Sequence, residues 1–179
     1  MPQAPAAVRA AYAVFRRPAA QRDLLPPART KHARSVVARF VTRRISGTVA
    51  AHDRAWAIVR DDKLCTSVEL PGGGGGGCSP LRTTDGRAPW TFATTISQRR
   101  VDTPPTRARI IALLPDGTHD VRRTAADGTV TAVQIHGNAI DETFTREAPA
   151  RLTWVWVDGT TADPFNGAAM PPGLMVPTG

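Results

Sequence analysis

The sequence predicts a mainly β protein: an antiparallel β-sandwich, Ig-like or related, of about seven or eight strands, preceded by one or two basic N-terminal helices. Three observations support this fold class. Apolar and polar residues alternate from Ala55 onward, which is typical of half-buried strands. Turn dipeptides such as Asp127-Gly128 separate the alternating runs. Before residue 50, apolar residues recur instead at helical spacing.

Residues 1–50 are expected to form a basic helical segment with a proline linker. A first helix is predicted over residues 4–17, because apolar residues fall at i, i+3, i+4 and i+7, and Pro18 ends it. The paired prolines Pro26-Pro27 predict an extended linker. A second basic helix is predicted over residues 29–44. The apolar stripe of the first helix consists of Val8, Ala11, Tyr12 and Phe15.

Residues 51–159 are predicted to form the β-sandwich, and residues 160–179, rich in Pro and Gly, a flexible tail. In the last strand Trp154 and Trp156 share one face, and we expect them to pack in the core or beneath an N-terminal helix. The predicted strands cover residues 55–59, 64–70, 90–96, 107–114, 119–124, 129–135, 139–144 and 151–157.

One hairpin allows two registers. A two-residue loop would place His119 opposite His136, as in a metal site, but would pair apolar residues with charged ones. A three-residue loop over residues 126–128 pairs Val121 with Val133 instead. Because a slip of one residue moves every side chain to the other face, burial favours the three-residue loop. Its predicted inner face consists of Val121, Val133 and Ile135, and its outer face of Asp120, Arg122, Gln134 and His136.

Six consecutive glycines, Gly72 to Gly77, precede the second cysteine. They match a phosphate-binding loop only if Cys78 replaces the lysine that neutralises phosphate charge, and cysteine cannot supply that charge. Ordering six glycines would also cost much conformational entropy. The run is therefore predicted to be a mobile, glycine-rich hairpin tip.

Cys65 and Cys78 bracket this run, and its glycines can bring the two sulfurs together without strain. A disulfide between them is expected to stabilise the fold by about 3 kcal/mol. It requires an oxidising compartment. Two buried, reduced thiols are the alternative. A catalytic thiol has less support, because no flanking residue marks either cysteine as activated.

The formal charge of +8 is concentrated near the N-terminus. Residues 1–60 hold twelve Arg or Lys against two acids, whereas residues 61–179 hold eleven against thirteen. Such a basic arm suits an anionic surface or a protein partner. Nucleic acid has no support from a binding motif or from stacking aromatic residues, and a solvated helical face is the alternative. The candidate anion-contacting residues are Arg16, Arg17, Arg29, Lys31, Arg34, Arg39, Arg43 and Arg44.

No catalytic residue, metal or cofactor is predicted. The four histidines are scattered and lack metal-binding spacing, and there is no Gly-x-Ser-x-Gly motif. No apolar window is long enough to predict a membrane-spanning helix, and the N-terminus lacks the order of a signal peptide. Four carboxylates are weighed as a cation site, although turn and surface positions are their ordinary explanation: Asp116, Asp120, Asp141 and Glu142.

Four motifs follow one another over residues 12–157: AVFRRP, LCTSVEL, GGGGC and ALLPDGTHDVRRTAADGTVTAVQIHGNAI. Together they resemble a loosely defined group of uncharacterised β-rich proteins from GC-rich Gram-positive bacteria. The group's pattern is a Val-Pro-Asp-Gly-Val turn, an Ala-Asp-Gly turn and a strand ending near Asp-Asn, from which Leu114, Thr118 and Gly137 depart. The resemblance implies a β-rich fold, the cysteine bridge, and export or association with the cell envelope. It implies no activity.

We therefore expect a non-catalytic binding or interaction module that uses its basic arm. A small hydrolase is one alternative, with Cys78 or a carboxylate near a histidine in a loop-lined cleft. A bridge between the cysteines would exclude its thiol form. A purely structural domain is the other alternative.

Overall fold

A computed structural model describes residues 3–25, 40–45, 54–70, 73–82, 87–97, 107–145 and 148–164. Within these ranges the chain is mainly β and its sheets are antiparallel, as predicted, while the Ig-like relationship stays a prediction. Its helical elements are α1 (Ala6–Ala11), α2 (Ala13–Arg16) and η1 (Gln21–Asp23). Its strands are β1 (Val41–Arg44), β2 (Arg54–Arg60), β3 (Lys63–Leu70), β4 (Gly73–Pro80), β5 (Thr91–Ser97), β6 (Arg107–Leu113), β7 (His119–Ala125), β8 (Val130–Ala132), β9 (Ala139–Thr145), β10 (Ala150–Val155) and β11 (Thr161–Ala162).

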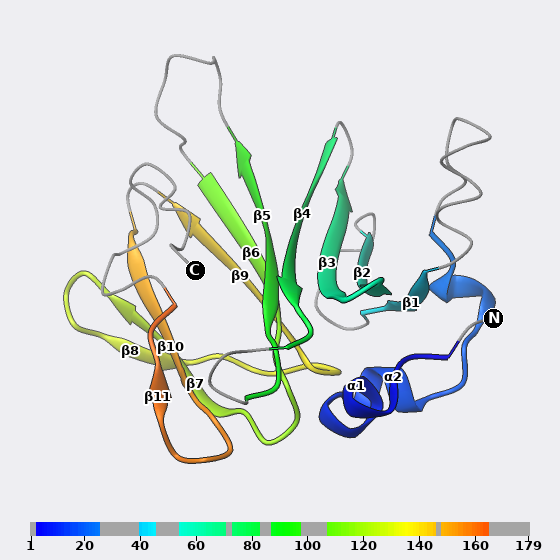
Figure 1. The fold of residues 1–179 in the computed structure, drawn as a ribbon. Helices are drawn as coiled ribbons and strands as arrows, with labels where there is room; N and C mark the ends of the chain where they lie inside the picture. The colour runs from blue at the N-terminus through cyan, green and yellow to red at the C-terminus, as the bar shows by residue number, and fades with distance from the viewer. Residues whose placement is uncertain are drawn as a thin grey trace.

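The strands form three sheets, which Figure 1 shows side by side with the N-terminal helices below sheet A. Sheet A has the order β1-β2-β3-β4, sheet B the order β5-β6-β9 and sheet C the order β11-β10-β7-β8. Sheet B is central, because its two faces belong to different hydrophobic cores.

The alternation along β6 explains the two cores. Ile111 packs with sheet A and the N-terminal helices, whereas its neighbour Ile110 packs against sheet C. Successive side chains of a strand point to opposite faces, so a central sheet can serve both cores. Trp154 and Trp156 lie buried in the core between sheets B and C, which confirms the expected core packing.

The β7–β8 hairpin has the predicted register. Val133 N–H donates to Val121 O at 2.8 Å, as the three-residue loop requires. Gly128 in that loop has a φ of 84°, which favours glycine. Val121 is buried, and Val133 and Ile135 pack against the same core. Burial of one apolar face has therefore selected this register over the one that pairs two histidines.

The glycine run is a strand, so the predicted mobile hairpin tip is wrong. β4 begins at Gly73 and pairs residue by residue with β3. In this register Cys65 lies directly opposite Cys78, and the two form a disulfide, which confirms the predicted bridge and excludes a free catalytic thiol. Glycine weakens an isolated strand, but the ladder with β3 and the covalent link order this one. On the other side of β4, the Thr91 hydroxyl donates to Gly77 O at 3.0 Å.

The predicted second helix is wrong at its C-terminal end, because Val41–Arg44 forms β1, and residues 29–39 lie outside the described part of the chain. β1 pairs in antiparallel fashion with β2. Val41 and Ile45 face the core that sheet A shares with the helices. The residues of this stretch have ordinary helix propensities, but pairing with a long buried neighbour overrides propensity.

The first predicted helix is broken at Tyr12, which has an extended conformation between α1 and α2. Its apolar stripe is still buried: Val8, Tyr12 and Phe15 belong to the core beneath sheet A, and Ala11 packs against it. One face of α1 and α2 is therefore packed in the folded core.

Candidate anion-binding pocket

Side chains from two turns hold the broken N-terminal helix in place. Asp116 Oδ1 accepts a hydrogen bond from Ala13 N–H at 3.1 Å, and Asn138 Oδ1 accepts one from Val14 N–H at 2.9 Å. These N–H groups begin α2 and have no partner within that helix. Arg16 adds an ion pair with Asp116 at 2.6 Å. The turns that the sequence identified therefore also anchor the N-terminal segment.

The two anchoring side chains also bind each other. Asn138 Nδ2 donates to Asp116 Oδ1 at 2.7 Å. Burial raises the pKa of the Asp116 carboxyl, but hydrogen bonds from Asn138, Arg16 and the Ala13 N–H, with the charge of Arg16, outweigh burial and lower it. Asp116 is therefore a carboxylate at neutral pH, already committed to this anchor.

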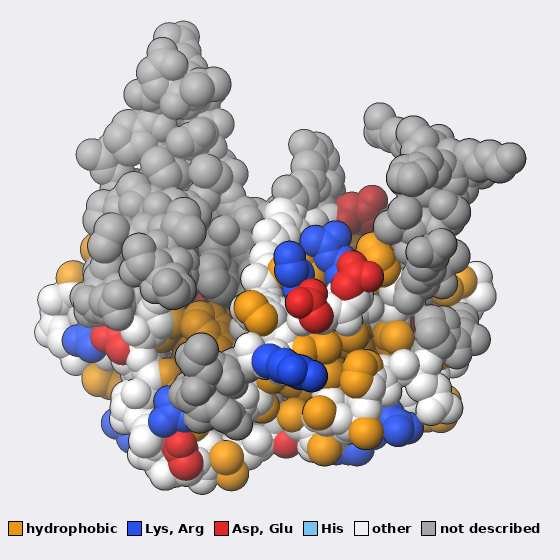
Figure 2. Space-filling model, viewed as in Figure 1, with side chains coloured by type: hydrophobic (Ala, Val, Ile, Leu, Met, Phe, Trp, Pro, Cys, Tyr) orange, Lys and Arg blue, Asp and Glu red, His pale blue; other side chains and the backbone are white. Residues whose placement is uncertain are grey.

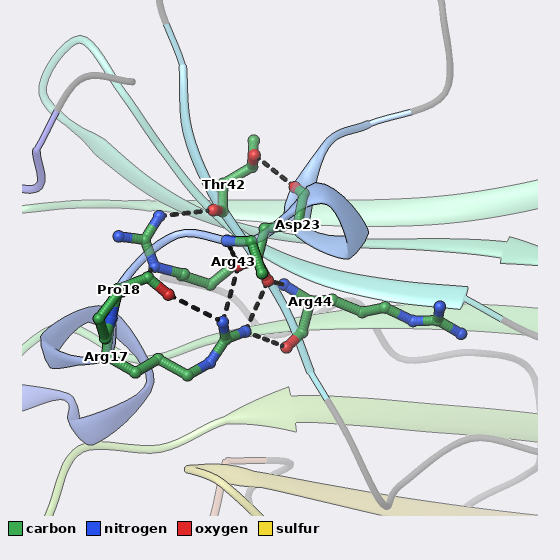
Figure 3. Close-up of polar contacts among 7 residues, drawn as sticks. Arg17, Pro18, Asp23, Thr42, Arg43 and Arg44 are labelled. Carbon is green, nitrogen blue, oxygen red and sulfur yellow. Dashed lines mark hydrogen bonds and ion pairs between the residues drawn. The ribbon is translucent and has the colours of Figure 1, made fainter.

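Asp23 is the centre of a second anchor (Figure 3). Its carboxylate is fully buried and accepts hydrogen bonds from Arg17 Nη1 and Nη2, at 2.7 and 2.6 Å. The N–H groups of Ala20 and Arg44 donate to it as well, at 2.8 and 2.7 Å. Burial raises the pKa of Asp23, but these hydrogen bonds and the Arg17 charge bring it down to about 2. This anchor joins the segment after α2 to β1.

Arg43 has a different environment from Arg17, although the two lie close together. Within the described part of the chain, its side chain donates to backbone oxygens alone, from Nε to Arg17 O at 3.3 Å and from Nη1 to Thr42 O at 2.8 Å. Only 6% of the residue is exposed. Burial lowers the pKa of Arg43, the charge of Asp23 raises it, and the charge of Arg17 lowers it further; the net direction is down. A buried cation without its own carboxylate is energetically costly.

A pocket of about 500 Å³ lies between the N-terminal segment and β1. Four arginines line it, and two of them already pair with Asp116 and Asp23, which leaves a formal excess of two positive charges. Arg9 donates to Gln3 Oε1 at 3.3 Å and, like Arg43, has no carboxylate partner in the described ranges. The lining residues are Gln3, Ala4, Arg9, Phe15, Arg16, Arg17, Pro18, Ala19 and Arg43.

The pocket has the chemistry of an oxyanion site. Guanidinium groups present several N–H donors in a planar fork, which matches the oxygens of phosphate and carboxylate groups. Its volume lies within the range of small-molecule sites. Phe15 and the prolyl ring of Pro18 supply apolar walls beside the charges.

The structure brings together only some of the predicted anion-contacting residues. Arg16, Arg17 and Arg43 line the pocket, while Arg44 does not, and its side chain points away from Arg17 and Arg43 in Figure 3. Sequence reasoning missed Arg9, although its spacing of seven residues from Arg16 is typical of one helix face. The remaining candidates, Arg29, Lys31, Arg34 and Arg39, lie outside the described residues.

The four carboxylates weighed as a cation site lie apart in separate ion pairs. Asp116 pairs with Arg16, Asp120 with Arg122, Asp141 with Arg109 and Glu142 with Arg123. His119 and His136 are both exposed, and His119 Nδ1 contacts Gly117 O at 2.9 Å. Over the portion of the chain that the structure describes, no three His, Cys, Asp or Glu side chains gather as a metal site.

Charges of both signs are mixed on the face drawn in Figure 2. Lys and Arg side chains stand next to Asp and Glu side chains near the lower ends of β3 and β4, and hydrophobic side chains gather below them. Where the chain is described, this face carries no continuous basic surface.

Comparisons of the chain with protein families, curated proteins and solved structures find no match. Among the helices in the described ranges, none is both long and apolar enough to span a membrane.

Proposed function

We propose that this protein is a non-catalytic binding module that takes an oxyanion, a phosphate or carboxylate group, in the arginine pocket. One observation carries the proposal: Arg43 is buried beside Arg17 and, among the residues that the structure describes, it donates only to backbone oxygens. An anion in the pocket would supply the missing negative charge and accept the remaining guanidinium N–H groups.

The anchors prepare the pocket for binding. Arg17 and Arg16 are fixed by Asp23 and Asp116, so they need not be ordered when the anion binds. Preorganised donors lose less conformational entropy on binding than mobile ones. Arg9 is exposed and lies at the pocket rim, where it can close on the ligand.

Calorimetric titration with inorganic pyrophosphate at low ionic strength tests this function. The Arg43→Gln variant is expected to bind about tenfold or more weakly, which is the effect of losing charge-assisted hydrogen bonds. Arg9→Gln, at an exposed position, is expected to weaken binding less without affecting the fold. Arg122→Gln, on the exposed face of β7, is the matched control.

The titration is repeated with citrate and with vesicles containing phosphatidylglycerol, which separates free oxyanions from an anionic surface. Binding should weaken as salt is raised, because the pocket charges are partly screened. The proposal is wrong if wild type and both pocket variants bind equally, or if none of the probes binds at low salt.

The disulfide supports a second element of the proposal, an oxidising compartment such as the bacterial envelope or exterior. Cys65–Cys78 lies in a sheet rather than beside a recognisable catalytic motif. Mass spectrometry of the natural protein after rapid alkylation would find the bridge intact in that compartment, and free thiols would contradict the placement.

A further inference from the structure

We propose that the Cys65–Cys78 disulfide is a thiol–disulfide exchange site, in which an external thiolate attacks Cys78 Sγ and Arg60 assists. This inference does not depend on the arginine pocket. It rests on the exposure of one sulfur, the pocket beside it and a cation held next to it.

The two cysteines differ in exposure. Cys65 is 4% exposed and packs in a small apolar cluster with Trp56 and Ile58, while Cys78 is exposed. A thiolate attacks one sulfur from the side opposite the other. For Cys65 that side is occupied by β2, where Ile58 is its register partner. For Cys78 that side is the one along which β5 packs, but Cys78 itself is exposed and lines a pocket.

The glycine run keeps the approach to Cys78 open. Gly76 lies two residues before Cys78, on the same face of β4, and contributes no side chain that could cover the sulfur. A pocket of about 360 Å³ reaches both cysteines over this bare surface. It is lined by Phe40, Ile58, Arg60, Cys65, Thr66, Ser67, Gly76, Gly77 and Cys78. The unusual sequence of β4 is therefore explained as access for a thiol.

Arg60 places a cation at the sulfur that is attacked. Its Nη2 lies 3.6 Å from Cys78 Sγ, and its guanidinium stands 5.8 Å from the centre of the Phe40 ring, which helps to hold it there. A neighbouring cation favours a thiolate over a thiol. Arg60 thus meets the incoming thiolate and later stabilises the thiolate of Cys78 itself.

The reaction consumes a dithiol and transfers two electrons to the protein. In the first step the thiolate forms a bond with Cys78 Sγ, the Cys65–Cys78 bond breaks, and Cys65 leaves with the electron pair and takes a proton from water. In the second step the other thiol of the dithiol, after losing its proton, attacks its own sulfur in the mixed disulfide. Cys78 leaves as a thiolate beside Arg60, and the dithiol departs as a disulfide.

The rate of reduction by dithiothreitol in the native, full-length protein tests this site, with free thiols trapped by alkylation and counted by mass spectrometry. Arg60→Gln is expected to slow reduction by about three- to tenfold, and Arg60→Lys to restore most of the rate. Arg54→Gln is the matched control, because Arg54 is exposed at the other end of β2 on the same face. Equal rates in wild type and Arg60→Gln would overturn the proposal.

A second measurement identifies the attacked sulfur. In Cys65→Ser and Cys78→Ser variants the remaining thiol is reacted with oxidised glutathione under native conditions. Cys78 is expected to form the mixed disulfide about tenfold or more faster than Cys65, because it is exposed. Faster reaction at Cys65 contradicts the proposal. So does a reduction rate in the wild type that is independent of dithiothreitol concentration, since that rate would report unfolding instead.

Discussion

Both halves of this molecule have an apolar core, but the N-terminal half also has specific links at the edges of its sheet. In the C-terminal half, residues 107–162, apolar side chains from sheets B and C fill one core, with Trp154 and Trp156 at its centre. In the N-terminal half, residues 3–80, specific links fasten the two edges of sheet A. The disulfide joins β4 to β3, and the Asp23 anchor ties β1 to the segment after α2.

The elements that need such links are those whose own sequence does not specify a strand. The alternation of apolar and polar residues in a strand predicts both its extended conformation and its buried face, whatever strand it pairs with. A run of glycines or arginines does not, since it carries no apolar pattern. In β1 and β4 the backbone conformation is therefore decided by the strands with which they pair. Four predictions test this comparison.

Removal of the disulfide should have the largest effect. A Cys65→Ala, Cys78→Ala double variant should lose about 3 kcal/mol of the free energy of unfolding, since the bridge closes a loop with a sequence separation of 13. Urea unfolding without reductant measures it. Amide exchange should increase first in β4, whose glycines supply no packing of their own; an unchanged unfolding midpoint would contradict the importance of the link.

Acid should weaken the anchor at the other edge of sheet A. The pKa of Asp23 in the folded protein is about 2, below its ordinary value of 3.8. Its contribution, about 2 kcal/mol, is therefore present above pH 4 and lost as the pH falls toward 2. Unfolding curves between pH 2 and 6 should show a steeper loss in wild type than in Asp23→Asn. Parallel curves for the two proteins would refute this assignment.

In the C-terminal half, the loss of stability should depend on whether the substituted residue is buried or exposed. Val121 is 3% exposed, so Val121→Thr should cost about 1–2 kcal/mol by burying a hydroxyl. Val130, on the neighbouring strand, is 56% exposed, and Val130→Thr should change the free energy of unfolding by less than about 0.5 kcal/mol. Thermal unfolding of the two variants compares them, and similar losses at both positions would mean that the register is wrong.

The smallest changes in the free energy of unfolding are expected from alanine substitutions at two glycines. At Gly128 the local backbone conformation opposes alanine, and at Gly76 a neighbouring strand does. Gly128 has a φ of 84°, so Gly128→Ala should cost about 1 kcal/mol although nothing lies near its Cβ position. At Gly76 a Cβ would lie 3.1 Å from Thr66 O, but the alanine also reduces the entropy of the unfolded chain. We expect a net change below about 0.5 kcal/mol there, measured by urea unfolding. A larger loss at Gly76 than at Gly128 would reverse this ranking.

The candidate pocket could be predicted only in part. The charge asymmetry pointed to Arg16, Arg17 and Arg43 among eight basic residues, because charge is a property of composition. Two of these arginines are neutralised by aspartates: Arg17 by Asp23, which is close in sequence, and Arg16 by Asp116, which is a hundred residues away. No periodicity relates such positions, so the pocket and its excess charge emerge only when the chain folds.

The sequence by itself determined the β fold of the C-terminal half, the three-residue hairpin loop and the pairing of the two cysteines, since alternation, turn residues and spacing act over short distances. The tertiary structure decided that the glycines form β4, that residues 41–44 leave the predicted helix for β1, and that Asp116 and Asn138 cap a broken helix. Hydrogen-bond partners and burial overrule weak local preference wherever the side chains carry no apolar pattern of their own.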